Sequence, residues 1–598
     1  MYGLTSTLRT AVTGLQVAQD GLGAAANNVT NAHTQGYTRK TVQQQAQHIL
    51  GLGAGVKSVA ISRNVDAFIE AQLRVQLGFN GRTATIANYA ERVQGLVFGD
   101  PSDTKTGLGS ALDAFTQAVE VAANNPEKSA QRMGVIGTAQ DLFHQLAKAD
   151  GHVQDLRQDA DRRIFSLVQN VNVALQSIHH LNGQIARSQT PGELLDQRDM
   201  LVAELARQTE ISTYMLDEHR IAIYGPGGQP LLEYTPRVLE YLPAATVTGN
   251  TEFGAIKVLA IDPATAKPDP NSAVDFMGTA DPNLKGELGG LLHARDRLLP
   301  ELTGQLGEMG AMVRFALDAA HNDANRLPPP QSVVGTRTDH AGVAAFGGTA
   351  YVAVVGANGT ELTIALDLAA AGNPAALAAE LDAQLGAYGT AGLDPDGRLV
   401  IELADPTQGL AFANGSSTIT APDGDGRERN WSFAHYFGLN DFVTQPTANS
   451  ARLQVRADLV AQPMRLASAM LDVGAAHDNG SRLGGVGDNR GLQLLAAAVD
   501  RPIRTQTQGG LPPAELSMRS YVADMVGYQA VIADQSSRAA SNDRVLLEEL
   551  TFRKASVSGV NVDEEMAHLM ILQQAYSASA RLITIADRLL EELLAIKR

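Results

Sequence analysis

The chain has 598 residues, of which 44% are hydrophobic, and it carries a formal net charge of −17. Its length exceeds what one hydrophobic core supports and predicts roughly three to five domains. The negative charge argues against a nucleic-acid partner, because a nucleic-acid groove needs a basic surface. No apolar run approaches the ~20 residues of a membrane span, so no membrane partner is expected. The absence of cysteine excludes disulfides, thiolate catalysis and cysteine-ligated metal clusters.

The N-terminal segment, residues 4–39, carries apolar residues at alternating steps of four and three. This spacing places a narrow apolar seam along one face of a helix, as in a coiled coil. Between residues 1 and 38 only Arg9 and Asp20 are charged, and small uncharged polar residues suit a face that packs against further protein. The seam consists of Leu4, Leu8, Ala11, Leu15, Ala18, Leu22, Ala25 and Val29.

Three glycines lie inside this helical pattern, Gly14, Gly21 and Gly23. Each costs ~1 kcal/mol relative to Ala in a helix, and a total of ~3 kcal/mol is enough to leave an isolated helix mostly unfolded. We therefore expect a segment that is disordered in the free chain and helical after assembly. The repeat ends in a turn rich in Asn, Gly and Thr at residues 27–37.

Residues 65–208 predict long helices with short breaks, the arrangement of an elongated bundle. Proline and glycine mark the breaks, for example Pro126 after an Asn pair. The helices are expected at 66–95, with an interruption near 78–81, and at 108–124, 129–190 and 193–210. Helical patterns return at 286–325 and 514–551.

Alternating apolar and polar residues predict β-structure in two further parts of the chain. The first part, 211–282, begins as a hairpin that turns near 225–228. The second, about 332–445, has short alternating runs rich in Ala, Gly, Val and Thr, with one short helix at 374–385. The chain is thus predicted to be an α+β multidomain protein, an elongated helical bundle with inserted β-rich domains.

The last helical pattern, residues 561–594, repeats the seven-residue spacing of the first. Neither seam can be buried by its own helix, so we expect paired N- and C-terminal coiled-coil helices; two unrelated amphipathic surface helices would show the same spacing. The C-terminal seam consists of Leu569, Leu572, Tyr576, Ile583, Ala586, Leu590 and Leu593.

The order of these patterns predicts concentric nesting, in which each inner segment is inserted into the one outside it. A terminal coiled-coil assembly domain is assigned to 1–64 plus 558–598. The helical bundle is assigned to 65–210 plus 283–330 plus 505–557. A β-rich segment occupies 211–282, and an outer β-rich insertion with a helical return segment occupies 331–504.

Candidate catalytic, cofactor and metal residues are weak throughout the sequence. His179 and His180 are adjacent and point to different helix faces, so they do not form a chelating pair. The glycine-rich stretch 484–491 fits neither a dinucleotide fingerprint nor a Walker loop. Acidic residues at 563–565 begin a predicted helix, where negative charge is favoured by the helix dipole. We expect a protein that is not an enzyme and has no cofactor or metal.

A second pattern in the N-terminal segment comprises Thr13, Gly14, Leu15, Gln19, Leu22, Asn28, Asn31, Thr34, Gly36, Tyr37, Thr38 and Arg39. Together with residues 558–594, it makes both ends of the chain resemble the family of bacterial flagellar rod, hook and hook-associated axial proteins. Internal stretches at 194–206, 286–309, 433–442 and 487–496 are similar to the hook-associated members, whereas 331–430 is similar to nothing recognised. His33 and Gln35 depart from the family's usual Asn and Pro.

The resemblance implies a structural protein that joins the flagellar hook to the filament after unfolded export through the flagellar type III channel. It implies as partners further copies in a ring, the hook protein on one side and a second hook-associated protein on the filament side. It also implies a cytoplasmic export chaperone at the C-terminal segment. The first residues lack the basic region and apolar core of a Sec signal, which agrees with this separate route.

The expected functional site is the assembly interface formed by the two seams and the turn. Asn27, Asn28 and Asn31 are candidate polar contacts to neighbouring subunits. A hook protein remains an alternative, although it would lack the long helices around residues 194–199. A hydrolase in the outer insertion is a remote alternative, because Asp394 and Asp396 lie in a turn. The interface residues are Leu8, Leu15, Leu22, Asn27, Asn28, Asn31, Gly36, Tyr37, Leu569, Leu572, Tyr576, Ile583, Leu590 and Leu593.

Overall fold

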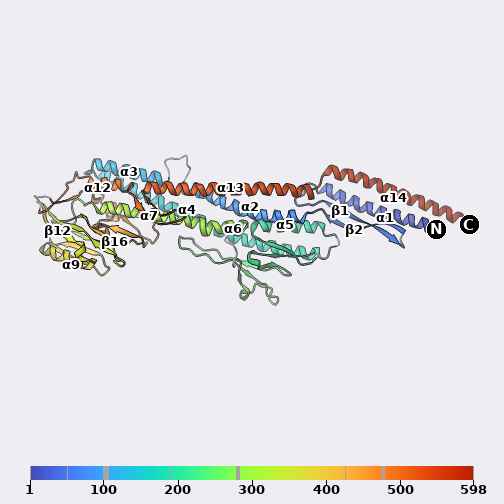
Figure 1. Cartoon of the computed structure of the whole chain (residues 1–598), viewed down its shortest axis with the longest axis horizontal. Coiled ribbons are helices and arrows are strands. Elements are labelled where there is room, and N and C mark those ends of the chain that lie inside the picture. Colours follow the sequence, from blue (N-terminus) through green and yellow to red (C-terminus); the bar gives the residue numbers. More distant parts are fainter. Residues whose placement is uncertain are drawn as a thin grey trace.

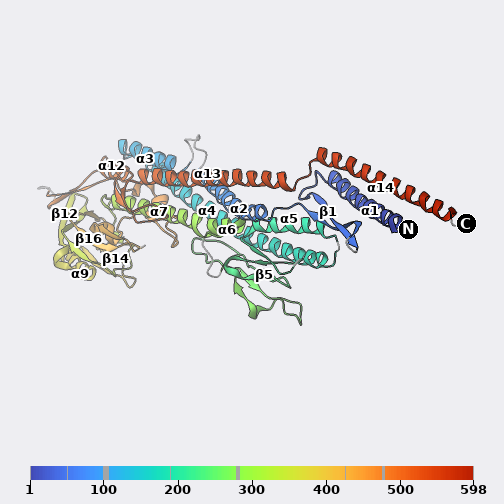
Figure 2. The same ribbon diagram turned by 45° about the vertical axis from the view of Figure 1, so that its right-hand side comes forward.

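The computed structural model shows an elongated molecule with both chain termini at one end and a β-rich body at the other (Figure 1). It describes residues 2–49, 52–98, 107–188, 190–217, 219–277, 283–424, 426–474 and 479–596. Long helices run between the two ends, and a smaller β-rich part projects from the middle (Figure 2). The predicted fold class, an α+β multidomain protein with an elongated bundle and paired terminal helices, is confirmed.

The terminal end consists of two long helices and a hairpin, α1 (Tyr2–Thr30), α14 (Val562–Ile596), β1 (Lys40–Ile49) and β2 (Leu52–Arg63). α1 ends at Thr30, inside the turn-rich stretch predicted at 27–37, and the residues after it form turns, with Thr34 N donating to Asn31 O at 2.9 Å and Gly36 at a φ of 78°. The antiparallel hairpin was not predicted, since β1 is rich in Gln and has few apolar residues to set an alternation.

The middle of the molecule is a helical trunk with one continuous hydrophobic core, which contains residues such as Leu112, Val153, Leu317 and Met525. α4 is the longest of its helices, with 57 residues. The trunk helices are α2 (Ala67–Val93), α3 (Leu108–Asn124), α4 (Ser129–Ile185), α5 (Gly192–Gln208), α6 (Gly286–His293), α7 (Leu299–Asn322) and α13 (Met518–Ser558). Two π-helical turns extend this set, η1 (Gln94–Phe98) and η4 (Ala294–Leu298).

The expected interruption of α2 near 78–81 is wrong, because α2 runs through these residues as one helix. Gly78 and Gly81 instead allow close packing. A Cβ on Gly81 would lie 2.4 Å from the carbonyl oxygen of Arg207, at the end of α5, and 3.1 Å from the backbone nitrogen of Glu287 in α6. Backbone cannot move aside as a flexible side chain can, so these positions require glycine for contact rather than for a break.

A β-rich segment follows α5 and packs against the trunk. Its inward residues, including Ile223, Leu231, Leu239, Val258 and Phe276, belong to the trunk core. The sheets have the strand orders β3-β4-β5 and β6-β7-β8. The strands are β3 (Ser212–Met215), β4 (Ile221–Tyr224), β5 (Pro230–Leu232), β6 (Val238–Glu240), β7 (Lys257–Leu259) and β8 (Val274–Asp275).

The outer body has a separate core around Ile364, Leu381, Ile401 and Phe437. Three antiparallel sheets have the orders β12-β11-β15, β13-β14-β9 and β10-β16-β17. The strands are β9 (Ser332–Val334), β10 (Ala345–Gly347), β11 (Thr349–Gly356), β12 (Gly359–Asp367), β13 (Gly389–Leu393), β14 (Leu399–Leu403), β15 (Gly409–Ala413), β16 (Thr418–Pro422) and β17 (Glu428–Trp431). The helices are α8 (Leu368–Ala371), α9 (Pro374–Leu385) and α10 (Phe433–Phe437).

The return segment after α10 leads back to the trunk. The sequence placed it in the outer insertion at 331–504, whereas Phe442, Leu459, Leu492 and Leu495 share the trunk core. Its helices are α11 (Ala457–Ala461) and α12 (Arg490–Ala497), and α12 packs on α3. Its strand pairs are β18 (Val443–Thr444) with β19 (Gln454–Val455), β20 (Leu471–Val473) with β21 (Ser481–Leu483), and β22 (Ile503–Arg504) with β23 (Glu515–Leu516).

Candidate assembly interface

The two terminal helices pack side by side along their length, and we call them the terminal pair (Figure 1). They run antiparallel, since Gly21 faces Leu572 and Gly14 faces Ser579. A Cβ on Gly21 would lie 2.9 Å from Leu572 Cδ2, which is closer than real Cβ contacts come. The helices therefore approach through small residues, and Ala11, Ala18 and Ala25 of α1 are buried in the same way.

The predicted seam residues are buried to different degrees within the chain. Leu572 is buried, and Leu8, Leu15, Leu22, Leu569, Ile583 and Leu590 are half-buried. Tyr576 is 39% exposed. The side chain of Leu593 lies outside the described part of the structure. Because most of these side chains are incompletely covered inside one chain, their assignment to an interface between subunits stays a prediction.

The β1–β2 hairpin covers a second side of α1. Gly55 of β2, at a φ of 107°, lies against Thr13, and the backbone N–H of Val56 donates to Thr13 Oγ1 at 3.3 Å. The uncharged polar face of α1 thus packs in part against the chain's own hairpin. Sequence reasoning expected protein on this face but found no candidate for it.

A polar cluster lies where α1 ends and α14 begins, with Asn28 at its centre. The Asn28 side-chain amide donates to Lys40 O at 2.9 Å and to Glu565 Oε2 at 3.0 Å. Its oxygen accepts from Lys40 N at 3.0 Å and from the Tyr37 hydroxyl at 2.9 Å. Arg39 completes the cluster, with its Nε 2.7 Å from Glu565 Oε1. Burial, followed by the nearby charges of Asp196, Glu193 and Glu565, raises the pKa of Tyr37 to about 12.

A second buried carboxylate, Asp196 of α5, lies on the trunk side of this cluster. Its oxygens accept from Thr38 Oγ1 at 2.6 Å, Lys40 Nζ at 2.6 Å and Arg63 Nη1 at 2.9 Å. Lys40 Nζ also lies 3.5 Å from the centre of the Tyr37 ring. The turn after α1 is therefore tied both to the trunk and to α14.

The predicted turn residues separate into different roles. The expectation that Asn28 reaches a neighbouring subunit is corrected, because both atoms of its amide are occupied within the chain. Asn31 donates to Asn27 O at 3.0 Å, and Asn27 is exposed. Gly36 has a positive φ, and a Cβ there would lie 2.1 Å from Met200 Sδ. Contacts of Asn27 and Asn31 with neighbours stay predictions.

The outward face of α14 leaves large apolar side chains in solvent. Met570 is 59% exposed, Ile571 62% and Ile585 55%. A shallow groove of about 760 Å³ follows this face, lined by residues that include Met570, Leu582 and Ile585. Soluble helices rarely leave so many apolar residues uncovered unless another surface covers them.

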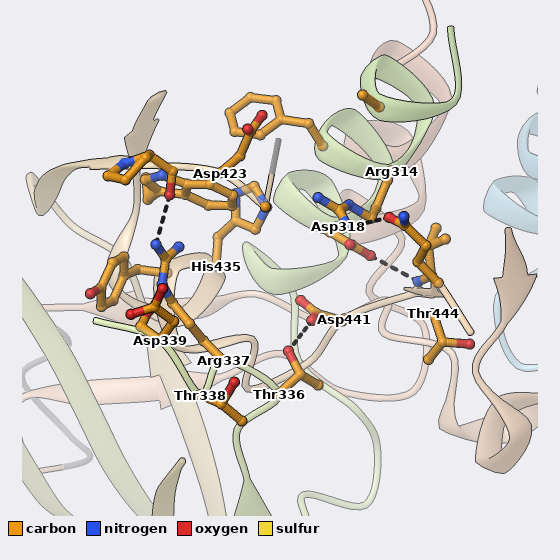
Figure 3. Close-up of a pocket in the computed structure, with 18 of the residues that line it drawn as sticks. Arg314, Asp318, Thr336, Arg337, Thr338, Asp339, Asp423, His435, Asp441 and Thr444 are labelled. Carbon is orange, nitrogen blue, oxygen red and sulfur yellow. Dashed lines mark hydrogen bonds between the residues drawn. The ribbon is translucent and has the colours of Figure 1, made fainter. Parts of the chain in front are cut away.

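A polar cavity of about 500 Å³ lies between α7 and the outer body (Figure 3). Its carboxylates are engaged: Asp318 accepts from the backbone N–H groups of Phe442 and Val443, and Asp441 accepts from Thr336 Oγ1 at 2.5 Å. Burial raises the pKa of Asp318 well above its usual range, and the Asp441 charge adds to this rise. These contacts fasten the outer body to the trunk and do not form a nucleophile with its base.

Other candidate chemistry also has a structural explanation. Arg398 forms ion pairs with Asp394 (Nε to Oδ2, 2.8 Å) and with Asp396 (Nη2 to Oδ2, 2.9 Å). These pairs explain the two acidic residues that the hydrolase alternative would use. Among the described residues, no cluster of three His, Asp or Glu side chains could hold a metal ion. The described helices also include none that is both long and apolar enough to cross a membrane.

Two family models match the chain. One, described as "Flagellar hook-associated protein FlgK helical domain", matches residues 97–327, and the other, "Flagellar basal body rod FlgEFG protein C-terminal", matches 555–596. Proteins named Flagellar hook-associated protein 1 from Salmonella typhimurium and Escherichia coli are 26% and 25% identical, over 99% of this chain and 100% of their own. The chain is thus similar, over almost its whole length, to flagellar hook-associated proteins.

Further similar proteins come from other species. The protein of the same name from Bacillus subtilis is 23% identical over 99% of this chain and 98% of its own. A solved structure, that of the flagellar hook junction protein FlgK from Burkholderia pseudomallei, aligns with 81% of this chain and 100% of its own at 16% identity and a TM-score of 0.46. This family is one of structural flagellar proteins.

The residues that sequence reasoning missed are the charged partners of the family's N-terminal pattern. Glu565 was explained as a charge at a helix start, yet it is buried and bound to Asn28 and Arg39. Asn561 caps the start of α14, since its Oδ1 accepts from Asp563 N at 3.0 Å. Asp196 lay in a recognised stretch but was given no role. The available signal was Arg39, a charged residue that follows an N-terminal segment with few charges. A charge at that position needs a partner of opposite sign.

Proposed function

We propose that this chain is a structural axial protein of the bacterial flagellum that joins the hook to the filament. The observation that carries the proposal is the terminal pair, whose outward apolar face is uncovered within one chain. Relatives named Flagellar hook-associated protein 1, matched over almost the whole length of both chains, support the same role. The match of a hook-associated helical domain to 97–327 favours this function over that of a hook protein.

Assembly proceeds by coupled folding of the terminal segments. α1 contains Gly14, Gly21 and Gly23 and is stabilised by contacts with α14 and the hairpin rather than by a core of its own. A helix with such a composition is marginal alone and becomes ordered when its neighbours are present. α14, with 35 residues, spans ~52 Å, enough to line part of the wall of a tube.

The proposed partners follow from this role. Further copies form a ring through the terminal pair, the hook protein lies on one side, and a second hook-associated protein lies on the filament side. Before export a cytoplasmic chaperone holds the C-terminal segment, and the unfolded chain leaves through the flagellar type III channel. A chain without cysteine suits that narrow route, because it cannot form a disulfide that would block passage. The protein then resides at the hook–filament junction.

Deletion of residues 560–598 tests the proposal directly. We expect the shortened chain to remain soluble and keep a cooperative thermal transition from the trunk core, which contains none of the described side chains of α14. We expect it to form no rings and to leave cells without attached filaments. A full-length variant with Arg297→Ala, at an exposed trunk position, serves as the control. Normal assembly of the deleted chain would refute the proposed function.

A further inference from the structure

The chain passes between the terminal pair and the trunk at two places, near residues 64–66 and 558–561. Such short connections leave the direction of the terminal pair on the trunk undefined unless other contacts fix it. The polar cluster described above lies at this joint, where the turn after α1, the end of α13 and the helix α5 meet (Figure 2). We call it the polar latch, and its members are Asn28, Tyr37, Thr38, Arg39, Lys40, Arg63, Asp196 and Glu565.

We propose that the polar latch is the positioning device of the junction, in which Asp196 holds the N-terminal turn on the trunk and Glu565 closes the latch when α14 arrives. This inference rests on the proposed function, because it concerns how the assembled terminal pair is oriented. It assigns the family's N-terminal pattern a role inside the subunit instead of between subunits.

The trunk half of the latch is independent of α14. Asp196 is held by α5, whose Val202 and Leu205 are part of the trunk core. Lys40 and Arg63, on the two strands of the hairpin, both bind this carboxylate. A buried carboxylate with two cations and a hydroxyl donor is well compensated, so this half can hold the hairpin on the trunk before α14 is in place.

The second half depends on α14. Glu565 accepts from Arg39 Nε and from the Asn28 amide, and these partners lie more than 500 positions away in the chain. The backbone on both sides is held as well: Arg39 N donates to Ser558 O at 2.8 Å, at the end of α13, and Asn64 Nδ2 donates to Val557 O at 2.9 Å. These two contacts come from the end of α13 and hold both chain crossings together, and the arrival of α14 adds the Glu565 contacts to them.

Asn28 and Tyr37 connect the two halves. Asn28 binds Glu565 with its amide nitrogen and the Tyr37 hydroxyl with its oxygen, while the Tyr37 ring lies against Lys40, which binds Asp196. Removing one partner of a buried, charge-assisted hydrogen bond leaves the other unsatisfied. Damage to either carboxylate is therefore transmitted to the backbone N–H of Lys40, which donates to Asn28 Oδ1.

The test uses flagella assembled from full-length variants, with amide hydrogen exchange at Lys40 as the readout and filament attachment as the functional measure. Asn28→Asp places a second carboxylate against Glu565, and we expect about tenfold faster exchange at Lys40 and fewer attached filaments. Adding Glu565→Gln to Asn28→Asp restores a donor opposite an acceptor, so the double variant should recover part of both losses. Asp196→Asn is expected to accelerate exchange at Thr38, whose N–H donates to Asp196 at 3.2 Å.

The matched control is Asp563→Asn, which removes the same charge from the first turn of α14 at an exposed position. It should leave both readouts at the wild-type level. The latch is refuted if the double variant is no better than Asn28→Asp, or if Asp563→Asn is as damaging as Asn28→Asp. Either result leaves the proposed function standing, since that function is decided by the 560–598 deletion.

Discussion

Two helices of this protein, α7 in the trunk and α14 in the terminal pair, show opposite patterns of burial. Most side chains of α7 are buried, because α4, α12 and α13 all pack against it. Among the described side chains of α14, Glu565, Leu572 and Ala586 are buried, and the others are half-buried or exposed. Both helices have apolar residues at helical spacing, so periodicity alone does not reveal how much of a helix its own chain covers.

The difference separates stability from assembly. Many apolar residues are buried in the trunk core, whereas the terminal pair buries few, and isolated helices are marginal in water. Apolar groups left exposed on α14 are available for contact with another protein surface. In such a protein the trunk can be folded while the terminal helices are only partly ordered until assembly.

The largest expected effect comes from Leu317→Ala in α7. Leu317 is fully buried, and such a substitution costs about 2–5 kcal/mol through lost burial and the cavity left behind. Trp431, the single tryptophan, packs against Phe315 of α7, with the two ring centroids 5.2 Å apart. Its fluorescence therefore reports unfolding in urea. The midpoint should fall clearly for Leu317→Ala.

Leu582→Ala on α14 is the matched control for this substitution. Leu582 is 46% exposed, so the free energy of unfolding of the free chain should change by less than about 0.5 kcal/mol, while assembly weakens. Equal shifts for the two variants would show that the terminal pair shares the trunk's cooperative core, and the comparison drawn above would then be wrong.

An intermediate effect is expected from pH at His321, which joins α7 to the return segment. Its Nε2 accepts from Ala467 N at 2.9 Å and its Nδ1 bonds to Asn440 O at 2.5 Å, which requires the neutral ring. Burial lowers the pKa of His321 to about 3. The unfolded chain binds the proton near pH 6.5, so this stabilisation is complete above pH 6.5 and is lost as pH falls toward 3.

Comparison of wild type with His321→Gln isolates this contribution, since the raised pKa values of Asp318 and Asp441 change stability in the opposite direction. Between pH 7 and 5 the wild type should lose about 2 kcal/mol more than the variant, measured by urea unfolding at each pH. His179→Gln, at an exposed position, should keep the wild-type slope. If the free energy of unfolding of His321→Gln fell with pH as steeply as that of the wild type, His321 would not remain neutral in the folded chain.

The smallest expected effect concerns two neighbouring glycines of α1. A Cβ on Gly23 meets no atom within 4 Å, so Gly23→Ala should stabilise the helix by ~1 kcal/mol and lower the critical concentration for assembly about fivefold. Gly21→Ala, with its Cβ 2.9 Å from Leu572, should gain less, because the contact with α14 must open. Identical gains would indicate that the terminal pair is looser than the structure shows.

The sequence predicted much of the fold where local pattern is sufficient. The expected helix at 108–124 is α3 itself, since the break before Pro126 and the apolar spacing agree. The hairpin at β1–β2 was missed because its Gln-rich first strand has no clear alternation, and Gly78 and Gly81 were mistaken for a break because their partner backbones come from distant residues. The seam was predicted as a pattern, but its charged partners Asp196 and Glu565 were not.

By itself, the sequence determined the helical periodicities, the absence of cysteine and the matching apolar seams at the two ends, because these properties depend on residues close in the chain. Only the tertiary structure decided that the terminal helices run antiparallel and that Asn28 turns inward. It also decided that Glu565 and Asp196 meet the same turn. These outcomes depend on contacts between segments hundreds of residues apart, and a buried polar group is placed by the partners that surround it in space.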